Sequence, residues 1–111
     1  MEIEKIKFER TGGFAGIRLA AEIELDDLPE DERRELLRLL DELDFEELPE
    51  KLARHAPVPD EFSYTISVIA KDKKEYTVSA GDTALPADMR PLLEMLEGIA
   101  KRQMRKHKQD D

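Results

Sequence analysis

The sequence contains no cysteine, and only two of its 111 residues are histidine. A chain without cysteine forms neither a disulfide framework nor a thiol-based active site. This fits a reducing compartment, and we expect a cytoplasmic protein. His55 and His107 are far apart in the sequence, and neither has a neighbouring histidine or cysteine with which to bind zinc. We therefore expect no bound metal and no cofactor.

Long apolar segments are also missing. No run approaches the ~18 apolar residues that cross a bilayer. The opening residues, MEIEK, lack the basic and then apolar pattern of a signal peptide. A length of 111 residues fits one domain with one core. These observations predict a soluble, intracellular, single-domain protein.

The charge is negative overall and unevenly distributed. The net charge is −9, yet residues 101–108 carry five Lys or Arg and residues 110–111 are two Asp, so residues 1–100 carry −12. Because an acidic body repels phosphate backbones, nucleic acid is not the expected ligand. The basic segment is either an arm for nucleic acid or lipid, or cations that complement a helix dipole and then fray into solvent. We expect one domain over residues 1–102 and a flexible basic tail over 103–111.

The few glycines are concentrated in one place. Three of the five lie within the segment RTGGFAG, residues 10–16, which we call the glycine-rich segment. Glycine adopts positive φ at no steric cost and allows another backbone to approach closely. Phe14 is a large apolar ring in this turn, where Asn, Asp or Ser is usual. Such a ring either packs back over the core or contacts a partner.

Apolar residues alternate with polar ones on both sides of this segment and again in the second half of the chain. Such alternation predicts half-buried strands. The expected inward-facing side chains are those of Ile6, Phe8, Ile17, Leu19, Ala21, Ile23, Phe62, Tyr64, Ile66, Val68, Tyr76, Val78 and Ala80. The connection over residues 49–60 contains three prolines and is predicted to be irregular.

Two segments show helical spacing instead. The first begins near Pro29 and presents Leu36, Leu37, Leu40 and Leu43; the second begins at Pro86 or Pro91 and presents Leu92, Leu93, Met95, Leu96 and Ile99. Phe45 and Leu48 are expected to face inward in a short extra turn. The order is ββαββα. We predict an α+β two-layer sandwich, with a four-stranded antiparallel sheet and two helices on one face.

No catalytic or ion-binding motif is present. Serine is scarce and has no histidine near it, and the acidic residues 26–32 lack the spacing and central glycine of an EF-hand loop. The glycine-rich segment lacks the Lys-Ser/Thr ending of a phosphate-binding loop and leads into a strand. We predict that the protein is not an enzyme.

Four stretches resemble one known family. Residues 6–17 (IKFERTGGFAGI) resemble the opening of emfourin, a family of protein inhibitors of thermolysin-like (M4) metallopeptidases such as protealysin. Residues 45–49 (FEELP), 60–65 (DEFSYT) and 89–93 (MRPLL) resemble later family elements. The similarity runs through about residues 3–100, and the basic segment beyond Ala100 has no counterpart in it.

The resemblance implies a small intracellular inhibitor that blocks the active-site cleft of an M4 zinc metallopeptidase, and that is monomeric when free. It assigns binding to the glycine-rich segment, with residues Arg10, Thr11, Gly12, Gly13, Phe14, Ala15 and Gly16. These peptidases resemble one another in preferring a bulky apolar side chain just after the scissile bond, and Phe14 is such a side chain. The zinc belongs to the enzyme.

Two alternatives stay open at this point. One is a small assembly module that uses the polar sheet face or the long second helix as a docking surface. The other is a tail-driven binder of nucleic acid or membrane, which the acidic body opposes.

Overall fold

The helices and strands follow the predicted order along the chain. The computed structural model describes residues 2–12, 18–52 and 61–109. The long strands are β1 (Ile3–Gly12), β2 (Leu19–Glu24), β4 (Phe62–Ala70) and β5 (Glu75–Gly81), and the long helices are α1 (Glu30–Glu42) and α2 (Arg90–Gln109). The predicted ββαββα order is confirmed.

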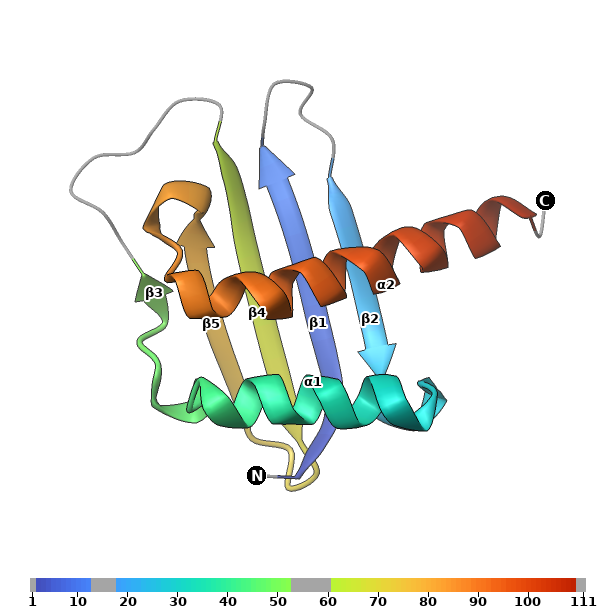
Figure 1. Ribbon diagram of the computed structural model, residues 1–111, viewed down its shortest axis with the longest axis horizontal. Coiled ribbons are helices and arrows are strands. Elements are labelled where there is room, and N and C mark those ends of the chain that lie inside the picture. The colour runs from blue at the N-terminus through green and yellow to red at the C-terminus, as the bar shows by residue number, and fades with distance from the viewer. Residues whose placement is uncertain (1, 13–17, 53–60, 110–111) are drawn as a thin grey trace.

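The strands form one open sheet in the order β2-β1-β4-β5-β3. The four long strands pair antiparallel, whereas β3 (Lys51–Leu52) pairs in parallel with β5. Both helices lie across the same face of the sheet (Figure 1). The predicted two-layer α+β sandwich is therefore confirmed. The addition is β3, which lies in the predicted connection and is too short to show an alternating pattern.

The core lies between the sheet and the two helices. Alternating strand positions face the helices, as the sequence predicts, and of the expected inward-facing residues Ile17 lies outside the described residues. The buried residues include Ile6, Phe8, Leu19, Ile23, Tyr64, Ile66, Val68 and Val78 from the strands and Leu92, Leu93, Leu96 and Ile99 from α2. Phe45, in a short 3-10 helix (Phe45–Glu47), is buried as predicted. Burying each such large side chain stabilises the fold by about 1.5–3 kcal/mol.

Helix α1 corrects one expectation. Leu39 is buried beside Leu36 and Leu40, whereas Leu37 is 36% exposed. Successive helical residues are rotated by about 100°, so Leu37 lies outside the arc that contains Leu36 and Leu40. The interpretation that placed Leu37 on the inner face was wrong because the leucines are too dense here for spacing alone to choose between neighbours.

Helix α2 begins at Arg90, with Pro91 in its first turn, and a short 3-10 helix (Ala87–Met89) precedes it. Its last part passes beyond β2 (Figure 1). Arg102 forms two hydrogen bonds of 2.7 and 3.0 Å with Glu32 of α1. The backbone stays helical through Gln109, so most of the predicted tail continues this helix. Among the described residues, no helix is long and apolar enough to span a membrane.

Deletion of residues 105–111 is expected to change the free energy of unfolding by less than about 0.5 kcal/mol, since the last described contact of α2 with the sheet comes earlier. That contact is the hydrogen bond of 3.3 Å from the Gln103 side chain to the Glu22 carbonyl. Urea denaturation of the full-length and shortened proteins measures the difference. A loss of several kcal/mol would show that the basic segment belongs to the folded domain.

Candidate functional site

The glycine-rich segment joins two strands at one end of the sheet. β1 ends at Gly12 and β2 begins at Leu19; Phe62, the first residue of β4, lies opposite Gly12 in the register. The last residue of β5, Gly81, lies opposite Ser63 at the same end. We call this the loop end of the sheet. Of the predicted site residues, Arg10, Thr11 and Gly12 are described here, and Gly13, Phe14, Ala15 and Gly16 lie outside the described residues.

Gly12 has both properties that make glycine necessary. Its φ is +87°, in the left-handed region that other residues rarely adopt. A Cβ atom added to it would lie 2.6 Å from the carbonyl oxygen of Glu61, which is backbone and cannot swing aside. The entry into the glycine-rich segment is therefore fixed by backbone geometry that only glycine accommodates.

Gly12→Ala is expected to lower the free energy of unfolding by about 1–2 kcal/mol from the positive φ alone, and by more once the overlap with Glu61 is relieved. The matched control is Gly98→Ala. Gly98 lies in α2, and a Cβ atom added to it would meet nothing within 4 Å, so this change is expected to stabilise the protein by about 0.5–1 kcal/mol. Denaturant titration compares them, and equal stability of the two variants would contradict this account of Gly12.

Arg10 is turned toward the helices. It follows Ile6 and Phe8 at two-residue steps, so its side chain lies on the helix-facing side of β1. Its Nη1 atom lies 2.5 Å from Oε2 of Glu97 on α2, and its guanidinium carbon lies 4.6 Å from the centre of the Phe62 ring. Both charged side chains are mostly buried, with 17% and 22% exposed. Arg10 thus ties the end of β1 to α2.

Thr11 points to the opposite side of the sheet from Arg10, as alternation requires, and it is partly buried opposite Ser63 on β4. The structure therefore gives the three described site residues different positions. Arg10 braces the segment from the helix side, Thr11 flanks it on the other face, and Gly12 sets its backbone direction.

A second set of polar contacts fixes the neighbouring strand ends. Asp82, which follows β5, accepts a hydrogen bond of 3.0 Å from Arg90 at the start of α2 and one of 3.4 Å from the Tyr64 hydroxyl. Burial, followed by the nearby carboxylates of Glu97 and Asp82, raises the pKa of Tyr64. The raised pKa keeps the hydroxyl protonated, and so able to donate, to a higher pH than in an exposed tyrosine.

Glu61 completes this bracing just before β4. Its carboxylate accepts hydrogen bonds from the backbone N–H and the hydroxyl of Thr83, at 3.0 and 2.7 Å. Thr83 belongs to the short 3-10 helix Asp82–Ala84, so the bonds hold the start of β4 against the chain that leaves β5. Sequence reasoning missed Glu61, Asp82 and Glu97. The one available signal was the alternation that places Arg10 on the helix side, where a carboxylate partner is required.

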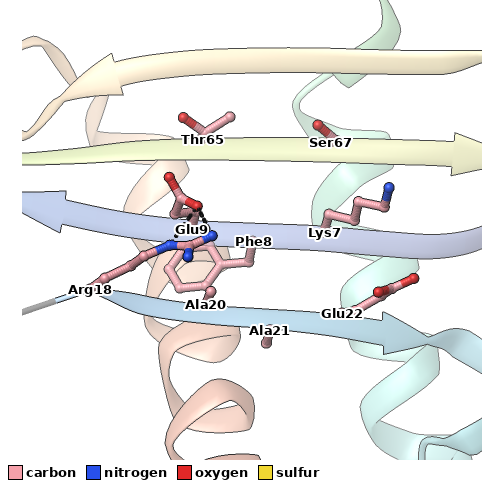
Figure 2. Close-up of a pocket in the computed structure, with 9 residues that line it drawn as sticks. All are labelled: Lys7, Phe8, Glu9, Arg18, Ala20, Ala21, Glu22, Thr65 and Ser67. Carbon is pink, nitrogen blue, oxygen red and sulfur yellow. Dashed lines mark hydrogen bonds and ion pairs between the residues drawn. The ribbon is translucent and has the colours of Figure 1, made fainter.

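The opposite face of the sheet is open and polar. A shallow hollow of about 430 Å³ lies over β1, β2 and β4, with Thr65, Ser67 and Ala20 at its surface (Figure 2). Glu9 and Arg18 are paired across it, with 2.8 Å between Arg18 Nε and Glu9 Oε2. Lys5 and Glu22 pair nearby at 2.6 Å. The charged residues that line the hollow are two cations, Lys7 and Arg18, and two carboxylates, Glu9 and Glu22, so the hollow carries no net charge to attract a ligand.

Metal ligands do not converge in the part of the chain that the structure covers. Over residues 2–12, 18–52 and 61–109, no three His, Asp or Glu side chains are placed to hold an ion. The acidic side chains at the start of α1 instead lie at the positive end of the helix dipole, where negative charge is stabilising. Glu30 also pairs with Arg34 one turn along, at 2.8 Å.

Comparisons with known proteins identify one family. A sequence model of the Emfourin family matches residues 8–97, a range that includes the whole glycine-rich segment. Among solved structures, the chain is similar to "Emfourin (M4in) from Serratia proteamaculans, M4 family peptidase inhibitor", with 21% identity, a TM-score of 0.42, and 75% of this chain and 79% of that chain covered. No curated protein matches.

Proposed function

Because the chain belongs to the emfourin family, we propose that it inhibits a thermolysin-like (M4) zinc metallopeptidase by placing its glycine-rich segment in the active-site cleft. The observation that carries the inhibitory role is the family match over residues 8–97. On this assignment the chain acts by binding and is not an enzyme. It needs no metal of its own, because the zinc is the enzyme's.

The geometry of the loop end supports the use of this segment. Its two flanking strands are paired as far as Arg10 opposite Leu19, and β1 is also paired with β4 as far as Gly12. A segment whose first residues are held in a sheet loses less conformational entropy on docking than a free peptide. Such anchoring also opposes the extended geometry that cleavage demands, so the segment would bind without being a good substrate.

Phe14 is the proposed anchor, although it lies outside the described residues. Thermolysin-like peptidases are expected to accept a bulky apolar side chain just after the scissile bond, and Phe14 provides one between glycines that let the cleft approach the backbone. We further propose that the free protein is a cytoplasmic monomer that binds neither nucleic acid nor membrane. The support is its net charge of −9 and its polar outer sheet face.

The mode of inhibition tests this proposal. Initial rates of a thermolysin-like peptidase are measured at several concentrations of a short peptide substrate and of the pure protein. Occupation of the cleft predicts competitive behaviour, so the apparent inhibition constant rises linearly with substrate concentration. Inhibition that is independent of substrate concentration would place the contact outside the cleft and contradict the role of the glycine-rich segment.

A further inference from the structure

Neither α1 nor α2 covers the helix-facing side of the sheet at its loop end (Figure 1). α2 crosses the strands below their ends, and β1 and β4 extend past it toward the loop end, on the side away from α1 (Figure 1). Phe62 is the first residue of β4 and shares this side with Tyr64, Ile66 and Val68, which are buried. Phe62 itself is 36% exposed. No helix in the described part of the chain covers its ring.

The exposed ring is held from behind. The Arg10 guanidinium lies over one face of it at 4.6 Å, and the Tyr64 ring is tilted against it with 6.4 Å between ring centres. Arg10 is in turn fixed by Glu97 on α2, and its Nε atom is buried without a hydrogen-bond partner among the described residues. An arginine in this position stacks on the aromatic face at the cost of one hydrogen bond. The ring therefore has a fixed orientation before any partner arrives.

The ring is also next to the proposed binding segment. Gly12 and Phe62 are directly opposite each other on neighbouring strands, which puts their Cα atoms about 5 Å apart. Gly12 has no side chain to shield the ring, and the next residue along the chain is Gly13. A cleft that closes around the segment would therefore meet the edge of Phe62.

We propose that Phe62 is a second peptidase-binding residue, which packs against an apolar rim of the cleft while Arg10 and Glu97 position its ring. The inference rests on the proposed function and extends it beyond the glycine-rich segment. The partner surface is assigned as apolar because Glu97 balances the charge of the Arg10 guanidinium behind the ring, so the ring itself presents an uncharged aromatic edge. Rigid aromatic side chains of this kind dominate the affinity of many interfaces.

Inhibition constants of three variants test the proposal. Phe62→Ala is expected to weaken inhibition about 10- to 100-fold, and Phe62→Tyr, which keeps the ring, to retain it. The matched control is Leu37→Ala. Leu37 is equally exposed, at 36%, but lines a hollow with Ile3, the first residue of β1, which is about 30 Å along the strand from Gly12. Leu37→Ala is expected to inhibit like the unmodified protein. Its melting temperature is expected to change about as much as that of Phe62→Ala.

Phe62→Glu tests the same contact by adding a charge to it, whereas Phe62→Ala only removes the ring. Position 62 is 36% exposed, so a glutamate carboxylate there stays hydrated and the variant is expected to fold, but a charge at an apolar rim is expected to reduce inhibition more than alanine does. Folded Phe62→Ala or Phe62→Glu proteins that inhibit as well as Leu37→Ala would overturn the proposal while the inhibitory function stands. An unmodified protein that fails to inhibit would overturn the proposed function, and this inference with it.

Discussion

Ile66→Asp is expected to unfold the domain. Ile66 is 1% exposed at the centre of the sheet, opposite Phe8 on β1 and Val78 on β5. The change removes an apolar side chain from the core, which alone costs about 2–5 kcal/mol, and it buries a carboxylate with no partner. Because domains are stable by only about 5–15 kcal/mol, the native state should be lost. Far-UV circular dichroism and thermal unfolding measure the effect.

Ala20→Asp is the control for that experiment. Ala20 lies on the open polar face of the sheet and is exposed, so its carboxylate stays hydrated and the fold is expected to persist. A comparable loss of stability in both variants would mean that the sheet is covered on two sides. The two-layer architecture would then be wrong.

Phe14→Ala is expected to weaken inhibition of the peptidase roughly 30- to 1000-fold, which corresponds to about 2–4 kcal/mol for a well-buried interface aromatic. The glycines and the paired strands are unchanged, so the melting temperature is expected to stay close to that of the unmodified protein. Parallel measurement of the inhibition constant and the melting temperature separates the two effects.

If Phe14 instead packs over the core, Phe14→Ala is expected to affect stability rather than inhibition. The melting temperature would then fall, and inhibition would change only as far as folding does. A stable Phe14→Ala protein with undiminished inhibition would remove Phe14 from the interface and move the binding contact elsewhere, most plausibly to pairing along a strand edge.

The sequence predicts the fold correctly where apolar and polar residues alternate regularly. Alternation in β1 and β4 placed Ile6, Phe8, Ile66 and Val68 correctly because each faces a core on one side only. The leucine-rich stretch of α1 was less informative, since adjacent leucines compete for one narrow face and Leu39 was missed. The two residues of β3 carry no period at all.

The contacts around the candidate site were less accessible. The glycines and Phe14 are conspicuous in the sequence, but the ion pair between Arg10 and Glu97 joins residues 87 positions apart. No short sequence pattern identifies such a pair, because the partner of Arg10 depends on which residue of α2 lies over β1. The alternation of Phe62 with Tyr64 predicts that Phe62 is buried. It is exposed because of where α2 crosses β4, which the sequence pattern does not indicate.

Titration of a thermolysin-like peptidase with the pure protein tests the central claim most directly. The enzyme is held well above the expected dissociation constant, and residual activity on a peptide substrate is followed as the protein is added. Inhibition predicts a linear fall to near zero at about one equivalent, with a serine peptidase unaffected under the same conditions. Full activity at a large excess of folded protein, across several thermolysin-like enzymes, would contradict the assignment.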